Sequence, residues 1–178
     1  AAGAAVTSEF YINDAGAQID TFGESVLAAA LGEPAPEGAY PGTYVAELGA
    51  RALVERPDLG ELPRAEAILV ARELAYAWQL AEIQSSLELF NVHFDVWFSE
   101  RTLHAADPAS GASPIDEAVD RLRVQGHVFD EDDAIWVRTT DFGDDKDRVI
   151  RRGNGVYTYF AADAAYYLSK RDRGFGLT

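Results

Sequence analysis

The order in which strand-like and helix-like patterns alternate along the chain is the feature that most constrains its fold. Residues 7–12 are rich in β-branched and aromatic side chains, which favours a strand. Residues 13–16 carry turn and N-cap chemistry, and Gly32 can cap the helix expected from about 17 to 31. The apolar face of that helix would consist of Ile19, Phe22, Val26 and Ala30.

Helical patterns dominate the next part of the chain. Three prolines predict a loop at 33–42, and helices are expected at 44–54 and from Pro63 to about Asn91. The apolar stripe of the longer helix predicts a buried set: Leu69, Tyr76, Leu80, Ile83, Leu87 and Phe90. Residues 94–98 alternate little between apolar and polar, which suits a buried strand of an α/β sheet.

The second half of the chain predicts a small antiparallel insertion. After a loop at 101–112, a short helix at 115–124 begins at a capping pattern of Ser113 with Asp116. Strands are expected at 127–129, 134–140, 148–152 and 156–160, and a helix at 161–170. The whole order predicts an α/β fold with a parallel core, a helical excursion and this insertion.

The composition limits the functions that this chain can have. Among 178 residues, 15 basic side chains face 30 acidic ones, and the net charge of −15 disfavours binding of phosphate backbones by this chain alone. The absence of cysteine excludes disulfides, and no signal peptide or membrane span is visible, so we expect a cytoplasmic location and no membrane partner. The absence of methionine leads us to expect excision from a longer protein.

Few side chains have the spacing of a metal or catalytic site. His93, His104 and His127 are far apart and share no ligand spacing, so no metal site is expected. The acidic runs at 130–133 and 144–147 could hold magnesium, but solvated turns are the simpler interpretation, because Mg²⁺ usually needs a substrate phosphate as well.

The most informative segment is the strand-to-helix junction at 157–163. Residues at the carboxyl ends of parallel strands line ligand clefts, so Tyr159 is expected at the end of the strand. Asp163 is expected in the first helical turn, where the helix N-terminus would stabilise its charge. From the residues alone, an early-helix acid beside a core tyrosine is the simpler interpretation of this pair.

Motifs along the chain resemble those of the arginyl-tRNA synthetases of bacterial type, a branch of the class I aminoacyl-tRNA synthetases. The matching stretches are EFYINDAGAQI at 9–19, YPGTYV at 40–45, HFDVWFSE at 93–100, WVRTTDFGDDKDRVI at 136–150 and the segment 157–174. The resemblance implies a class I Rossmann-like nucleotide-binding core. Its core pieces would be 1–33, 91–100 and 156–178, with a helical excursion at 34–90 and a connective insertion at 101–155.

The resemblance also implies a function. An arginine–tRNA ligase activates L-arginine with ATP and magnesium and transfers it to tRNA-Arg. The positions that match the family's arginine-binding tyrosine and aspartate are Tyr159 and Asp163, which reverses the simpler interpretation of this pair. No catalytic residue is expected within the segment, and Asn13 and Asp14 are only loop candidates for an ATP contact.

Two signatures of the family do not occur in this chain. Its histidine-containing ATP signature would precede Ala1, and its lysine-bearing signature loop would follow Thr178. Because these parts stabilise the reacting phosphates, we expect the isolated chain to be inactive and to bind no ATP tightly. The alternative is a non-catalytic module, derived from a synthetase, that acts in binding or interaction.

Overall fold

The computed structural model describes residues 3–176, so the outermost residues of the expected core pieces, 1–2 and 177–178, lie outside the described part. The chain divides into two compact units, with the boundary between Phe98 and Ser99. Mixed helix and strand content with a small antiparallel sheet confirms the predicted α/β class. Within residues 3–176, no helix is both long and apolar enough to cross a membrane.

The first unit begins with a short strand and a helix, as predicted. Strand β1 spans Glu9–Ile12 and helix α1 spans Ala17–Leu31. Gly32 ends α1 in the left-handed conformation, and its N–H donates to the carbonyls of Ala28 and Ala29. The N-cap of α1 is Gly16, within the turn predicted at 13–16; it makes no side-chain capping hydrogen bond, and its φ of 81° suits glycine.

Three helices form the core of the first unit. Helix α2 spans Thr43–Glu55, and a 3-10 turn at Leu59–Glu61 connects it to helix α3, Arg64–Leu89. Both α2 and α3 pack on α1. The residues that fill this core are Phe22, Val26, Leu27, Ala30, Val45, Leu48, Ala52, Leu59, Ala67, Ala71 and Ala75.

The buried stripe of α3 differs from the predicted one. Its buried residues are Ala67, Ala71 and Ala75, whose spacing of four places them on one face. Leu69 and Ile83 are exposed, and Phe90, just after the helix, is 81% exposed. Small side chains let α3 approach α1 closely. The larger apolar residues of the predicted stripe lie beside this contact between α1 and α3 or past its end.

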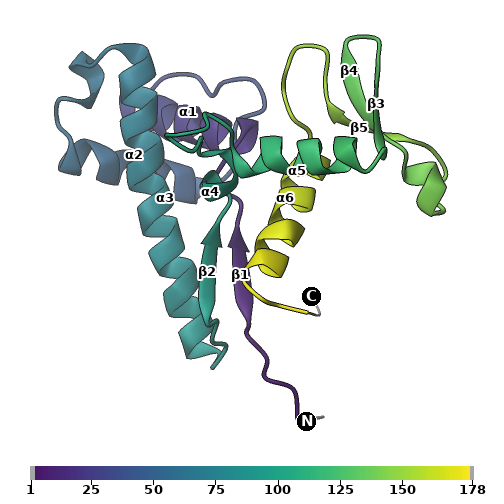
Figure 1. The fold of residues 1–178 in the computed structure, drawn as a ribbon. Coiled ribbons are helices and arrows are strands. Elements are labelled where there is room, and N and C mark those ends of the chain that lie inside the picture. Colours follow the sequence, from purple (N-terminus) through teal and green to yellow (C-terminus); the bar gives the residue numbers. More distant parts are fainter. Residues whose placement is uncertain (1–2, 177–178) are drawn as a thin grey trace. The chain divides into compact units, whose positions relative to one another are not determined.

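Strand β2, Val96–Ser99, pairs with β1 in a two-stranded sheet, and the two arrows point the same way in Figure 1. The carbonyl of Ser8 accepts hydrogen bonds from the N–H groups of Asp95 and Val96, at 2.9 and 3.1 Å. Ring contacts between Phe10 and Trp97, with centroids 4.8 Å apart, join the two strands. Both strands lie within two residues of their predicted positions.

The second unit contains the predicted meander. Strands β3 (Val128–Glu131), β4 (Ala134–Val137) and β5 (Arg148–Arg151) pair antiparallel in that order. Asp132 and Asp133 form the first turn with positive φ angles. The predicted strand at 134–140 is too long, because a 3-10 turn at Thr139–Phe142 follows β4, and Thr139 donates its hydroxyl proton to the carbonyl of Lys146.

The helices of the second unit are α4 (Arg101–His104), α5 (Pro114–Val124) and α6 (Tyr159–Asp172), and α6 packs on α5 (Figure 1). The capping box of Ser113 and Asp116 at the start of α5 is confirmed. Two predictions are wrong: part of the loop at 101–112 is the helix α4, and residues 156–160 are not a strand. Only Tyr157 pairs there, with Arg151, and α6 begins two residues later.

The segment at the end of the chain therefore packs with the meander and with α5. Ala161, Ala162 and Ala165 are the buried face of α6, and Ile115, Ala118 and Val119 are the buried face of α5. The assignment of 156–178 to the same core as 1–33 and 91–100 stays a prediction, as do the excursion at 34–90 and the insertion at 101–155.

Candidate functional site

Tyr159 and Asp163 lie one helical turn apart on the same face of α6. Tyr159 is the first residue of the helix, and its side chain is 77% exposed. Asp163 is also exposed, and the helix has no acidic residue in its first turn. The expected support of Asp163 by the helix N-terminus is therefore wrong, because that effect fades beyond the first turn.

The exposed pair follows from how α6 is packed. The three alanines of α6 are buried where the helix packs within the unit, chiefly on α5 and β5, so Tyr159 and Asp163 lie on its outer side. Neither side chain is used in the core of the unit. A carboxylate and a phenol at a spacing of four are neighbours on a helix surface and can act on one ligand.

The guanidinium of Arg148 interacts electrostatically with Tyr159. Arg148 donates two hydrogen bonds to Asp144, at 2.8 and 2.7 Å, and one to Asp145 at 2.7 Å. The hydrogen bonds from Arg148 hold the pKa of Asp144 well below its usual range, and Asp144, with a smaller contribution from Tyr159, raises the pKa of Arg148. Two carboxylates therefore already pair with this guanidinium.

A small cavity lies at the carboxyl end of β1. It has a volume of about 310 Å³ and is lined by Phe10, Tyr11, Ile12, Asn13, Ile19, Phe22, Tyr76, Gln79, Leu80 and Ile83. Asn13, one of the two candidates for an ATP contact, supplies a polar group to its wall. Asp14, the other candidate, is 1% exposed, and its carboxylate accepts a hydrogen bond of 2.8 Å from the hydroxyl of Tyr76. Asp14 lies between β1 and α1, and Tyr76 belongs to α3, so this hydrogen bond connects the three elements.

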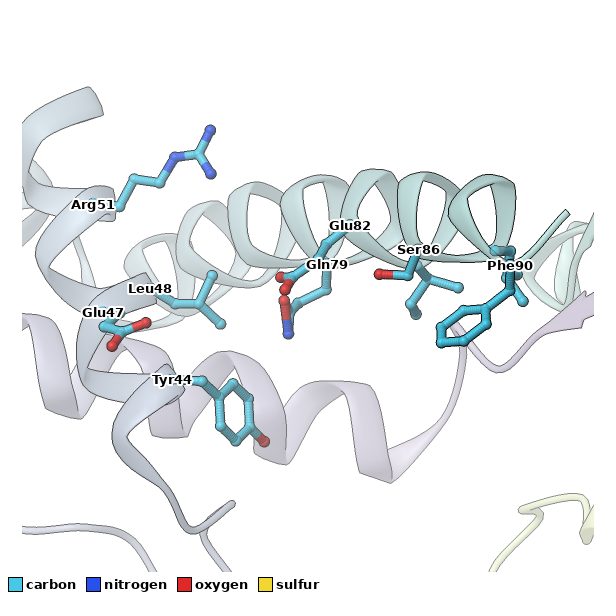
Figure 2. A pocket seen from close by; sticks show the side chains of 10 residues that line it. Tyr44, Glu47, Leu48, Arg51, Gln79, Glu82, Ser86 and Phe90 are labelled. Atoms are coloured by element: carbon cyan, nitrogen blue, oxygen red, sulfur yellow. The ribbon is translucent and has the colours of Figure 1, made fainter. Parts of the chain in front are cut away.

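A larger groove of about 830 Å³ runs between α2 and the second half of α3 (Figure 2). Its apolar side chains are Tyr44, Leu48, Ile83, Leu87 and Phe90, and its polar ones are Glu47, Arg51, Gln79, Glu82 and Ser86. The guanidinium of Arg51 lies over the ring of Trp78, with its central carbon 4.0 Å from the ring centroid. Ile83, Leu87 and Phe90 were predicted from the sequence to lie in a buried helix stripe, and no function was assigned to any residue of this groove.

Sequence reasoning also missed a buried carboxylate in the second unit. The side chain of Glu100 is only 13% exposed and lies 3.6 Å from the Nε2 atom of His104. Glu100 directly follows the last residue of β2, and residues at the carboxyl ends of strands often line ligand clefts in α/β sheets. That position was the signal that could have identified it.

No metal centre is visible among residues 3–176, where no three acidic or histidine side chains converge. His93 contacts Glu88 at 2.9 Å, and His104 contacts Glu100, so each contacts one nearby acid. The acidic run at 144–147 binds Arg148 and the 3-10 turn, since Asp147 accepts hydrogen bonds from both the N–H and the hydroxyl of Thr140.

Comparison with known proteins decides the family. The chain is 60% identical to the arginine–tRNA ligase of Renibacterium salmoninarum over 98% of its own length. It is homologous to a segment of the arginine–tRNA ligases. The ligase segment is also 47% identical to the arginine–tRNA ligase of Tropheryma whipplei, over 97% of its length. It spans 31% of the length of both relatives, and no protein-family model matches it.

Solved structures agree with this assignment. The ligase segment superposes on an arginyl-tRNA synthetase of Campylobacter jejuni with a TM-score of 0.79 and 30% sequence identity. That match covers 96% of the segment and 37% of the solved chain. An arginyl-tRNA synthetase of Plasmodium falciparum, with a TM-score of 0.57 and 14% identity, shares the fold. The resemblance found in the sequence motifs is confirmed.

Proposed function

We propose that this segment supplies part of the arginine pocket of an enzyme that activates L-arginine with ATP and transfers it to tRNA-Arg. The observation that carries this proposal is the 60% identity to an arginine–tRNA ligase over 98% of the chain. Tyr159 and Asp163, which match the family's arginine-binding positions, share an exposed face of α6 that packing leaves open for a ligand.

The chemistry of the pair suits the side chain of arginine. A guanidinium presents a planar fork of N–H donors, and the carboxylate of Asp163 can accept two of them side by side. The phenol of Tyr159, one turn earlier, can accept or donate a further hydrogen bond. Lysine lacks the fork, and citrulline lacks the charge, so both would leave the carboxylate poorly paired.

Kinetics of the complete ligase test this role. Asp163→Ala should raise the KM for arginine by about a hundredfold or more, because this proposal has Asp163 and the bound guanidinium paired out of water in the complete ligase, and removing one partner of such a pair costs about 2–5 kcal/mol. The KM for ATP should stay within about twofold. Asp172→Asn is the matched control, since Asp172 is an exposed acid on the same helix, 3.7 Å from Arg121. An arginine KM unchanged in Asp163→Ala would refute the assignment.

The adenylation chemistry needs groups that this chain does not contain. When the carboxylate of arginine attacks the α-phosphorus of ATP, pyrophosphate leaves, and the developing charge on the phosphates must be stabilised. The histidine and lysine signatures that do this in the family do not occur in the sequence, so the isolated segment is inert. ATP, magnesium and tRNA-Arg bind mostly through other parts of the ligase.

The same proposal gives the location. A ligase that charges tRNA acts where translation takes place, and the predicted cytoplasmic setting follows from that role. The absence of cysteine suits a reducing compartment.

A further inference from the structure

The start of helix α6 is held by contacts with distant residues and not by a local cap. Thr158 is the N-cap residue, but its side chain makes no capping hydrogen bond. Its hydroxyl instead donates to the carbonyl of Val149, at 2.8 Å, and its N–H donates to the carbonyl of Ile150, at 3.0 Å. These bonds attach one side of the helix start to β5.

A second contact attaches the helix start to α5. The hydroxyl of Tyr157 donates a hydrogen bond of 2.5 Å to Oδ1 of Asp116. Hydrogen bonds to an ionised carboxylate are shorter and stronger than neutral ones. The guanidinium of Arg151 lies over the Tyr157 ring, 5.6 Å from its centroid, and adds a cation–π contact on the other side.

The acceptor of this bond is itself fixed in place. The second oxygen of Asp116 accepts from the N–H of Ser113 at 2.8 Å and from its hydroxyl at 2.6 Å, which completes the capping box of α5. Burial acts to raise the pKa of Asp116, but the hydrogen bonds from Ser113 and Tyr157 outweigh it and lower the pKa. The carboxylate is therefore ionised at neutral pH.

The donor also stays in the required protonation state. Burial, together with the hydrogen bond to Asp116, raises the pKa of Tyr157 to about 12. The phenol is thus protonated throughout the range in which enzymes are assayed. The two groups therefore keep the protonation states that the bond needs, and Asp116 is placed by α5 while Tyr157 pairs with Arg151 of β5.

We propose that Tyr157 is a positioning residue for arginine, which fixes the first turns of α6 through Asp116 and so sets the directions of Tyr159 and Asp163. The inference rests on the proposed function of that pair. Tyr157 lies two residues before Tyr159 and six before Asp163, and its own side chain turns toward α5, away from the exposed face. Displacements of about 1 Å in a positioned group can cost about a hundredfold in rate.

Tyr157→Phe in the complete ligase removes the bond while keeping the ring. We expect the arginine KM to rise about tenfold, because without this bond the start of α6 can shift and misplace Tyr159 and Asp163. The ATP KM should stay within about twofold, since a shift of α6 disturbs only the arginine side. Asp116→Asn should raise the arginine KM as well, and adding Tyr157→Phe to Asp116→Asn should raise it little further, because Asp116→Asn already weakens the bond from Tyr157.

Tyr167→Phe is the control, because it removes a phenol hydroxyl farther along the same helix and should leave both KM values unchanged. Two results would overturn the inference. One is a Tyr157→Phe variant that loses thermal stability but keeps an arginine KM within twofold of wild type. The other is an equal rise in the KM values for arginine and ATP.

Asp163→Ala, assayed in parallel, separates the two proposals. A normal arginine KM in Asp163→Ala refutes the proposed function, whereas a raised KM there beside a normal one in Tyr157→Phe refutes only the positioning role.

Discussion

Asp116 shows how a single carboxylate can link the stability of this protein to pH. Its oxygens accept hydrogen bonds from Ser113 and Tyr157, and its pKa in the folded state lies below the ordinary value of 3.8. A depressed folded-state pKa adds stability above the unfolded-state pKa, and that stability is lost as the pH falls through the folded-state value. The contribution should therefore be complete above about pH 5 and decline below about pH 4.

Asp116→Asn tests this linkage directly. The variant should be less stable than wild type at pH 7, and the difference between them should shrink as the pH is lowered toward 3, because protonation removes the same charge from the wild type. Urea unfolding midpoints of both proteins between pH 7 and pH 3 measure the effect. Asp120→Asn, an exposed acid on the same helix, should show no such convergence. A constant difference at every pH would contradict the role of the Asp116 charge.

Helix packing in the first unit depends on a glycine at the contact of α1 and α2. A Cβ atom at Gly49 would lie 2.6 Å from the backbone nitrogen of Ala30 and 3.0 Å from the carbonyl oxygen of Val26. Both atoms belong to the backbone of α1, so they cannot rotate away as a side chain could. The two helices can approach this closely only because residue 49 has no side chain.

Gly49→Ala should lower the free energy of unfolding by about 1–3 kcal/mol, as overpacking does, even though alanine has the higher helix propensity. Ala50→Gly, at an exposed position of the same helix, should cost only about 1 kcal/mol through propensity. Denaturant unfolding measures both. A Gly49→Ala protein as stable as wild type, or more stable, would show that α1 and α2 do not meet at this position.

Sequence patterns predicted the elements well where local chemistry decides them. The ranges of α1 and α5, the left-handed cap at Gly32 and the capping box at Ser113 follow from adjacent residues. The buried stripe of α3 could not be predicted, because small alanines, and not its larger apolar residues, meet α1. The strand expected at 156–160 was wrong, because Tyr157 forms only an isolated bridge with Arg151 and α6 begins at Tyr159.

Only part of the candidate site could be predicted from the sequence. The motif match pointed to Tyr159 and Asp163, but periodicity placed them at a strand end and a first helical turn, whereas both are helical residues on an open face. The contact proposed to orient them joins Tyr157 to Asp116, 41 residues earlier in the sequence. A contact between residues so far apart cannot be predicted from local sequence patterns. The position of Glu100 directly after β2 could have indicated it, but its low exposure depends on tertiary packing.

At the scale of the whole molecule, we propose that this segment contributes to arginine binding and that activation needs other parts of the ligase. The segment spans 31% of the length of the Renibacterium salmoninarum ligase, and its net charge of −15 disfavours phosphate binding by this segment alone. Residues 1–178 alone should give no arginine-dependent exchange of pyrophosphate into ATP, whereas the complete ligase should. Exchange above background by the segment would contradict the proposed division, and circular dichroism would establish that the assayed segment is folded.

The most direct test of the central claim is calorimetry of L-arginine and citrulline with the complete ligase and its Asp163→Ala variant. Sites built to pair with a polar group reject analogues that lack the partner by about 10⁴-fold, so the wild type should bind arginine and give no measurable heat with citrulline. The variant should lose most of its affinity for arginine and with it most of this discrimination. Equal arginine affinity in wild type and variant would contradict the assignment of the guanidinium to Asp163.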